Sequence, residues 1–353
     1  MMEKIRDFID AAGWPRLIIG LFLLSLFIAA PFVEVNLWTS LSDVIVRFGM
    51  WGILVLAMVP MVQGGCGLNF GLPLGIIAGL LGAVTSVEFQ LTGLAGFLCA
   101  VAFAIPVAVF LGWGYGLLLN RVKGSEMTIA LYVGFSSVAF MSMMWLLLPY
   151  KSQDMIWAYG GKGLRTTISV ENYWYHSLND LFTIQIGEHF YFPTGMILFF
   201  AIMCLLVWAF FHTKTGTAMT AAGSNPEYAR ASGVNVDKMR IISVILSTVL
   251  GAVGIIVYEQ SFGFIQLYLG PFWMAFPAVA GILLGGASVH KATMVNVIVG
   301  TFLFQGILAM TPSVINNIIQ TDMSETIRII VSNGLILYAL TRTITIKSAK
   351  VKK

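Results

Sequence analysis

Long apolar runs separated by shorter polar connections cover almost the whole chain. A helix needs about 20 mostly apolar residues to cross the hydrocarbon core of a membrane. By that measure the sequence predicts ten membrane-spanning helices, the eighth of which is short and interrupted by Pro277. The predicted spans are residues 17–33, 46–63, 72–87, 91–119, 127–148, 195–211, 241–258, 272–284, 294–310 and 327–340. We therefore expect an all-α polytopic membrane protein, with a single transmembrane domain over residues 1–353.

The composition of the chain supports the same class. Hydrophobic residues make up 58% of the sequence and charged residues only 10%, whereas about 25% of the residues in ordinary soluble domains are charged. The mean hydropathy of +0.88 excludes an intrinsically disordered chain, because disorder requires low hydrophobicity. These values exclude a soluble globular protein and place the chain in the cell membrane.

The basic residues are distributed unevenly between the two sides that ten spans define. Cytoplasmic loops of membrane proteins carry an excess of Lys and Arg. The side of the two termini carries most of the 20 Lys and Arg residues, namely Lys4, Arg6, Arg16, Arg121, Lys123, Lys214, Arg230, Lys238, Arg240, Lys291, Arg342, Lys347, Lys350, Lys352 and Lys353. We therefore expect both termini in the cytoplasm. Because the basic residues follow the predicted membrane orientation, the net charge of +4 does not indicate nucleic-acid binding. No nucleic-acid partner is expected.

Two of the predicted loops are long. The outer loop at 149–194 is rich in Tyr and Trp, which is typical either of an aromatic belt at the membrane surface or of a docking surface for an external partner. The inner loop at 212–240 is the most polar part of the cytoplasmic face. We expect it to contain a helical run, a break at 223–226 and a second short helix at 227–232.

The predicted spans lack the groups that usually carry out chemistry. Glu88, Glu126, Glu259 and Arg328 are expected at span ends, where they can reach water, and the span centres contain no ionisable residue. The sequence has no HExxH, GxSxG or Walker A motif, and its histidines and cysteines lack metal-ligand spacing. We expect no enzymatic activity, no cofactor and no metal site.

Glycines recur at intervals that let helices pack closely. The pairs are Gly75 and Gly79, Gly251 and Gly254, and Gly281 and Gly285. A denser string, QGGCGLNFG at 63–71, separates two spans and is either a plain turn or an irregular segment lining a wet cavity. An uncharged path lined by amides and aromatic rings suits a small neutral polar solute such as a sugar. Its candidate residues are Gln63, Asn69, Phe70, Phe264, Tyr268 and Trp273.

Three segments, in order along the chain, resemble the inner-membrane permease subunit of ABC importers of the ribose/galactose and branched-chain amino acid type. GGCGLNFG at 64–71 is similar to the family's GGIDLSVG, and PAVAGILLGGASV at 277–289 to its AIAAVVLGGTSL. The most specific match is AAGSNPEYARASGVNVDKMRI at 221–241, which resembles the cytoplasmic signature G-x-N-x-x-A-A-R-x-S-G-I-N-V. The string LNFG is also similar to the FNIG of nucleoside-type relatives. A nucleoside, a vitamin-like molecule or a branched-chain amino acid therefore stays an alternative to a sugar.

The resemblance implies a helical subunit that works beside a second permease subunit. It also implies two cytoplasmic ATPase subunits and an external solute-binding protein as partners. An inverted repeat between spans two to five and seven to ten is implied as well, and the predicted topology agrees with it. The signature segment couples such a permease to its ATPase, and the matching residues here are Gly223, Asn225, Ala229, Arg230, Ser232 and Gly233.

A carrier or channel that works without an ATPase is the alternative from another class. An ion-coupled secondary carrier would need an ion site, which carbonyls and hydroxyls could supply for Na⁺. Hydroxyls available within or near the spans include Ser86, Ser136, Ser137 and Ser332. The absence of ionisable residues from the span centres favours the ABC permease, because proton-driven carriers usually keep such residues there.

Overall fold

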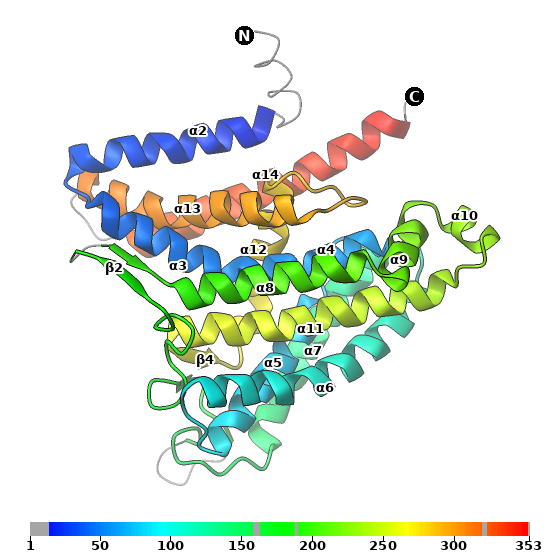
Figure 1. Cartoon of the computed structure of the whole chain (residues 1–353), viewed down its shortest axis with the longest axis horizontal. Coiled ribbons are helices and arrows are strands. Elements are labelled where there is room, and N and C mark those ends of the chain that lie inside the picture. Colours follow the sequence, from blue (N-terminus) through cyan, green and yellow to red (C-terminus); the bar gives the residue numbers. More distant parts are fainter. Residues whose placement is uncertain (1–13, 158–162, 188–189, 320–322, 352–353) are drawn as a thin grey trace.

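Helices make up most of the part of the chain that the computed structural model describes, residues 14–157, 163–187, 190–319 and 323–351 (Figure 1). The helices are α2 (Trp14–Ala29), η1 (Ala30–Val33), α3 (Leu37–Leu56), α4 (Met58–Gln63), α5 (Leu72–Glu88), α6 (Gly93–Arg121), α7 (Glu126–Leu147), α8 (Thr194–Phe211), α9 (Lys214–Ser224), α10 (Pro226–Ala231), α11 (Val236–Phe262), α12 (Gly270–Leu284), α13 (Met294–Ile319) and α14 (Ser324–Val351). The strands are β1 (Thr167–Ser169), β2 (Ile184–Ile186), β3 (Phe190–Phe192) and β4 (Phe264–Gln266).

Seven helical segments of the described chain are long and apolar enough to cross a membrane. The shorter apolar helices α5 and α12 coincide with the predicted third and eighth spans, and the predicted tenth span lies within α14. These assignments confirm a polytopic helical membrane protein, while the count of ten and the inverted repeat stay predictions. Several helices extend beyond the predicted spans, α13 to Ile319 among them. The helix of the second span begins at Leu37, nine residues earlier than predicted, because the side chain of Asn36 caps it by accepting hydrogen bonds from the N–H groups of Trp38 and Thr39.

The helix α3 gives way to α4 at Ala57. Proline has no N–H, and its ring clashes with the carbonyl four residues earlier, which for Pro60 is that of Leu56. The hydroxyl of Ser247 in α11 donates a hydrogen bond of 2.5 Å to the carbonyl oxygen of Ala57. A carbonyl at the break in the helix is therefore satisfied from within the protein, as membrane-buried backbone requires.

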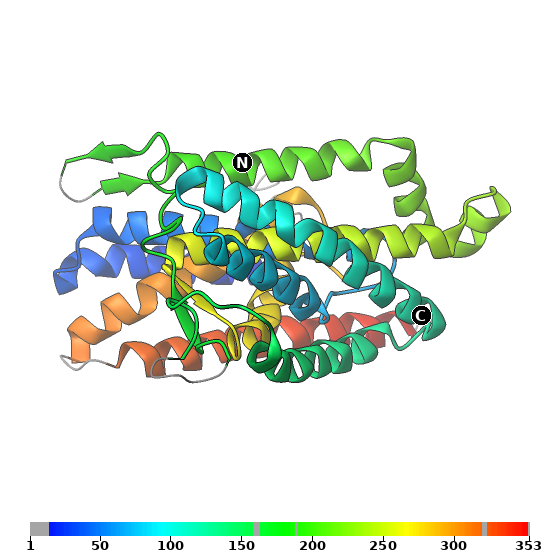
Figure 2. The same cartoon turned by 90° about the horizontal axis from the view of Figure 1, so that it is seen from below.

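Four strands of three residues each lie in the outer loop and directly after α11, and the mostly helical described chain agrees with the expected all-α polytopic membrane protein. Strand β1 pairs with β4 in antiparallel register, and β2 forms a hairpin with β3. Both views place this hairpin at the opposite end of the molecule from α9 and α10 (Figures 1 and 2).

The hydroxyl of Tyr191 in β3 donates to the Asp180 carboxylate, and burial next to this carboxylate raises the pKa of Tyr191 to about 12. The pairing of β1 with β4, which directly follows α11, fastens the outer loop to the end of that helix.

Helix α11 lies at the centre of the bundle and contacts α3, α5 and α6. A Cβ atom at Gly79 of α5 would lie 2.5 Å from the carbonyl oxygen of Ala252 in α11, and one at Gly75 would lie 2.5 Å from that of Thr248. Only glycine allows such close contact of the two backbones. The predicted role of this glycine pair in helix packing is therefore confirmed.

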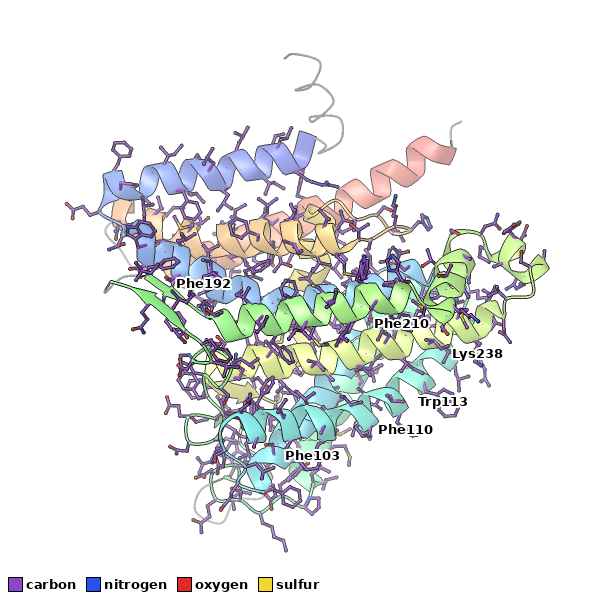
Figure 3. The ribbon with its side chains drawn as sticks, in the orientation of Figure 1. Phe103, Phe110, Trp113, Phe192, Phe210 and Lys238 are labelled. Carbon is purple, nitrogen blue, oxygen red and sulfur yellow. The ribbon has the colours of Figure 1, made fainter. Side chains whose placement is uncertain are left out.

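One side of α6 is apolar and exposed. Phe103, Phe110 and Trp113 project away from the bundle, with exposed fractions of 39%, 68% and 50% (Figure 3). A large exposed apolar face on a helix of this length is what contact with lipid requires. The charged Lys238 lies near the end of the bundle where α9 and α10 are found.

We predict that Gly79→Val destabilises the protein, because the added side chain would collide with the backbone of α11. Overpacking of a tight contact costs about 1–3 kcal/mol. The midpoint of thermal unfolding in detergent should fall accordingly. The control is Gly114→Val in α6, where no atom lies within 4 Å of the added Cβ. Equal losses in the two variants would contradict the close packing of α5 against α11.

Candidate functional site

The glycine-rich segment at 64–71 connects α4 to α5 without being helical. Gly65 and Gly67 have φ values of +74° and +79°, a backbone conformation that favours glycine. The N–H of Gly65 bonds to the carbonyl of Val62, and the N–H of Cys66 bonds to that of Met61, so the end of α4 is closed by its own backbone. The segment is therefore an ordered turn inside the protein.

Two of the predicted path residues fasten this segment to the rest of the bundle. The amide of Gln63 donates a hydrogen bond of 2.5 Å to the carbonyl oxygen of Ala292. Asn69 is completely buried, donates to the hydroxyl of Ser247 at 2.7 Å and accepts from that of Tyr115 at 3.3 Å. Both amides are thus occupied by contacts within the protein.

Arg240 holds the segment from the side of α11. Its guanidinium donates to the Glu126 carboxylate at 2.6 Å, to the side-chain oxygen of Asn120 at 3.0 Å and to the carbonyl oxygen of Gly65 at 3.4 Å. The side chains of Arg240 and Glu126 are only 9% and 16% exposed. From its sequence, Arg240 was expected only as one of the basic residues of the cytoplasmic side, and this role was not predicted. The signal that could have suggested it is that Arg240 lies within the family-like segment at 221–241.

We predict that Arg240→Met is strongly destabilising, because it leaves the Glu126 carboxylate without its partner. Breaking a buried ion pair costs about 3–5 kcal/mol. The control is Lys123→Met, which removes the exposed Lys123–Asp237 ion pair; such surface pairs contribute about 0–1 kcal/mol. Thermal unfolding of the purified variants measures both effects. Similar losses of stability in the two variants would show that the Arg240 network contributes no more to stability than a surface ion pair does.

The signature segment forms two short helices at one end of the bundle, as the sequence predicts (Figure 1). Its first helix, α9, ends directly against the glycine-rich segment. A Cβ atom at Gly223 would lie 2.7 Å from the backbone nitrogen of Gly65 and would collide with the carbonyl oxygen of Gln63. The two segments, about 160 residues apart in sequence, therefore touch through their backbones.

Each of the other signature residues has a local position that explains its type. Asn225 caps α10 by accepting a hydrogen bond from the N–H of Tyr228, and Ala229 is buried against the base of α11. Ser232 ends α10, and Gly233 follows it with a φ value of +82°. Arg230 is exposed, and no side-chain hydrogen bond reaches it from the described residues. The pair of short helices is thus held by local caps and packing, and the exposed guanidinium of Arg230 has no side-chain hydrogen bond within the described part of the chain.

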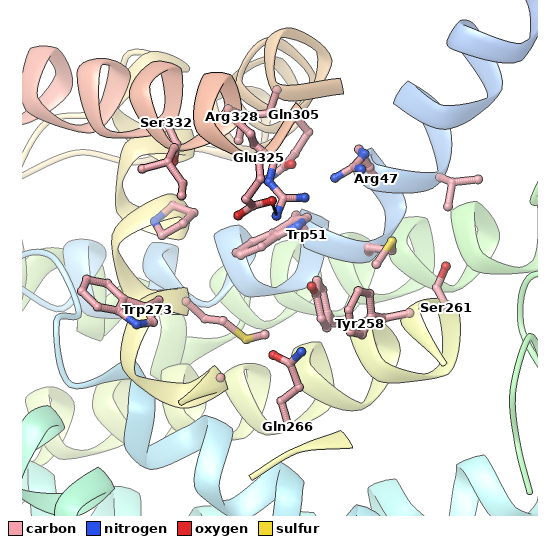
Figure 4. A pocket seen from close by; sticks show the side chains of 18 of the residues that line it. Arg47, Trp51, Tyr258, Ser261, Gln266, Trp273, Gln305, Glu325, Arg328 and Ser332 are labelled. Carbon is pink, nitrogen blue, oxygen red and sulfur yellow. Dashed lines mark hydrogen bonds and ion pairs between the residues drawn. The ribbon is translucent and has the colours of Figure 1, made fainter. Parts of the chain in front are cut away.

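A cavity of about 850 Å³ lies toward the other end of the molecule, between α3, α11, α12, α13 and α14 (Figure 4). This volume is within the range of sites that take small molecules. Its lining combines aromatic, amide, hydroxyl and charged side chains. The polar and aromatic members are Asp43, Arg47, Trp51, Tyr258, Ser261, Phe262, Gln266, Trp273, Gln305, Glu325, Arg328, Ser332 and Asn333.

The cavity has an aromatic side and a charged side. The rings of Trp51 and Tyr258 meet edge to face, with their centroids 5.4 Å apart. Arg328 forms an ion pair with Glu325 of the same helix, and Gln305 lies beside this pair (Figure 4). Flat apolar rings next to hydrogen-bonding groups can hold a ring-shaped polar molecule by stacking and hydrogen bonding at once.

Of the six predicted path residues, only Trp273 lines this cavity. Phe70 packs against Phe276 with ring centroids 6.0 Å apart. Tyr268 donates to the carbonyl oxygen of Leu164, and Phe264 belongs to the strand that holds the outer loop. The structure therefore does not bring the six residues together in one site, and their role in a path stays a prediction.

Most of the residues that line the cavity were not predicted from the sequence. Asp43, Arg47 and Trp51 are four residues apart and so lie on one face of α3. Glu325, Arg328 and Ser332, which are three and four residues apart, likewise lie on one face at the start of α14. This periodic placement of polar residues was the available signal. It was hidden because Asp43 and Arg47 had been placed before or at the edge of a span rather than within a helix.

The expectation that Glu259 reaches water was wrong. Its side chain is 1% exposed, and neither carboxyl oxygen has a hydrogen-bond partner among the described residues. The reason is that the outer loop covers the end of α11: the N–H of His176 bonds to the carbonyl of Gln260, and that of Val170 bonds to the carbonyl of Gly263. A residue near the end of a helix is thereby enclosed.

In the described ranges, no group of three or more His, Cys, Asp or Glu residues is placed to hold a metal ion. His176 contacts Asp180 and stacks on Tyr175, and the ring of His212 bonds to the carbonyl oxygen of Trp208. His189 lies outside the described residues. The rings of His176 and His212 are therefore held by contacts within the protein.

Comparison with known families places the chain in one of them. The chain belongs to the family of permease components of branched-chain amino acid transport systems, which matches residues 40–340. This confirms the family predicted from the three sequence segments. No solved structure matches the chain significantly.

Several curated proteins are similar to the chain. The autoinducer 2 import system permease protein LsrC of Enterobacter sp. (strain 638) is 26% identical over 58% of this chain and 57% of its own length. The nucleoside ABC transporter permease protein NupC of Lactococcus lactis is 38% identical, but the match spans only 22% of this chain and 25% of that relative. The galactofuranose transporter permease protein YtfT of Escherichia coli (strain K12) is 22% identical over 92% of this chain and 89% of its own length.

Proposed function

We propose that this chain is the membrane-spanning permease subunit of an ABC importer, which carries a small polar solute of the sugar class across the cell membrane. The chain itself is not an enzyme in this proposal, because separate ATPase subunits hydrolyse ATP. Family membership and the sugar-related and autoinducer relatives support this assignment.

The observation that carries the proposal is that a polar cavity lies toward one end of the bundle and two exposed short helices, α9 and α10, lie at the other. The cavity at one end contains rings and hydrogen-bonding groups suited to a sugar. At the other end, α9 and α10 expose Arg230 and Glu227. The backbone contact between Gly223 and Gly65 joins α9 to the glycine-rich segment. A movement of α9 would therefore be transmitted to α4 and α5 without passing through flexible side chains.

Each proposed partner would bind a different part of the molecule: one end, the other end, or the open side of the cavity. An ATPase subunit would bind α9 and α10, and the second ATPase would bind a second permease subunit. Leu269 and Trp273 at the mouth of the cavity are 72% and 62% exposed, which supports a second permease subunit as the cover for this side. An external solute-binding protein would deliver the solute at the end that carries the β2–β3 hairpin.

A nucleoside is the second candidate for the solute. Trp51, Tyr258 and Trp273 would allow a base to stack, and the nucleoside permease NupC is among the similar proteins. A screen of the cognate solute-binding protein by thermal shift against sugars, nucleosides and branched-chain amino acids distinguishes these solutes. Stabilisation by sugars alone is the expected result.

We predict that Gly223→Val uncouples the importer, because the added side chain would push α9 away from the glycine-rich segment. The measurement is solute-stimulated ATP hydrolysis by the reconstituted complex of permease, ATPase and binding protein. Stimulation should fall at least about tenfold, equivalent to about 1.4 kcal/mol of coupling energy. The variant Gly114→Val, in open space on α6, is the control and should keep full stimulation. Undiminished stimulation in Gly223→Val would overturn the coupling role of α9.

We predict that Arg230→Glu weakens binding of the ATPase while leaving the fold of the permease intact, because the side chain is exposed and its charge is reversed. Co-purification of the ATPase with the permease measures the binding, and thermal unfolding checks the fold. The matched control is Lys151→Glu on the outer loop, which should retain the ATPase. Transport by the isolated permease in liposomes without ATPase would instead favour the secondary carrier.

A further inference from the structure

Two guanidinium groups from different helices line the charged side of the cavity, Arg47 of α3 and Arg328 of α14 (Figure 4). They lie close enough to repel each other electrostatically. Arg328 is compensated by its ion pair with Glu325. Asp43, one turn before Arg47, attracts Arg47 from a distance and is itself exposed. In the described part of the chain, no hydrogen bond or ion pair reaches the guanidinium of Arg47.

A free guanidinium in this position calls for an acceptor. Ionisable side chains within membrane segments are costly and mark the sites where solutes or ions bind. Arginine presents its N–H donors in a rigid planar fork that matches the paired oxygens of a carboxylate or phosphate. The amides and hydroxyls nearby, those of Gln305 and Ser332 among them, can add neutral hydrogen bonds but cannot balance the charge.

The aromatic side of the cavity lies next to this arginine. Trp51 follows Arg47 by one helical turn and contacts Tyr258. A molecule with a ring and an anionic substituent would therefore stack its ring on the aromatic side chains while the substituent reaches Arg47 and Arg328. We infer that the cavity takes a sugar-like solute that carries an anionic oxygen group, a carboxylate or a phosphate, bound between Arg47 and Arg328.

This inference rests on the proposed function as a permease and replaces the neutral solute that the uncharged span centres predict. It does not depend on the ATPase, so the two can fail separately. Loss of ATP coupling with intact anion preference would overturn the proposed function alone. Normal ATP coupling without anion preference would overturn the inference alone.

The test is tryptophan fluorescence of the purified full-length chain in lipid nanodiscs, titrated with two matched pairs of sugars. The pairs are galactose with galacturonate, and ribose with ribose 5-phosphate, so that the two arms distinguish a carboxylate from a phosphate. Because Trp51 lies in the cavity, the signal that disappears in Trp51→Phe reports binding there. We expect at least one anionic sugar to bind about tenfold more tightly than its neutral counterpart, since hydrogen bonds to charged groups are the stronger ones.

Variants of the arginine identify the cause of this preference. Arg47→Gln should reduce it to less than about twofold, and Arg47→Lys, which keeps the charge without the fork, should retain part of it. Lys151→Gln on the outer loop removes the same charge outside the cavity and should leave the preference unchanged. Should Arg47→Gln fail to fold, Arg328→Gln tests the same preference. Equal or tighter binding of the neutral sugars overturns the inference, as does a preference that persists in both glutamine variants. Absence of any Trp51-dependent signal with all four sugars overturns it too.

Discussion

The glycine-rich segment between α4 and α5 has to keep its backbone out of a helix inside a membrane protein, and the rest of the structure is arranged around this constraint. Buried carbonyl and N–H groups without partners would each cost several kcal/mol. Arg240 satisfies the carbonyl of Gly65, and Ser247 satisfies that of Ala57 at the preceding helix break. Both side chains come from α11, which therefore acts as the support for the whole α3–α4–α5 turn.

In the proposed coupling of the ATPase to the permease, this turn is the element that α9 would move. Glycine at 65 and at 223 lets the two backbones touch, and a direct backbone contact is much stiffer than one made through long side chains. The same turn is fastened to the segment after α12 through Gln63 and Ala292. Elements from both halves of the chain thus meet beside α9.

The cavity depends on a different balance. The charged groups that line it are tolerated because Glu325 pairs with Arg328, both side chains being partly exposed at 66% and 43%, and because Arg47 faces the open space of the cavity. Glu259, only one residue after the cavity-lining Tyr258, faces the packed interior instead and finds no hydrogen-bond partner among the described residues. Adjacent positions on one helix therefore differ completely in their surroundings, which no local sequence pattern records.

The sequence by itself determined the class of protein, most of the helices and the two short helices of the signature segment. Each of these follows from local properties: apolar length, the capping residue Asn225 and the glycine at 233 with positive φ. Only the tertiary structure decided which polar residues meet. Arg47 and Arg328 are about 280 residues apart, and Gly65 and Gly223 about 160, so their contacts depend on how helices cross. Periodicity fixes the face on which a side chain lies, but the partner of that face is set by packing among all the helices.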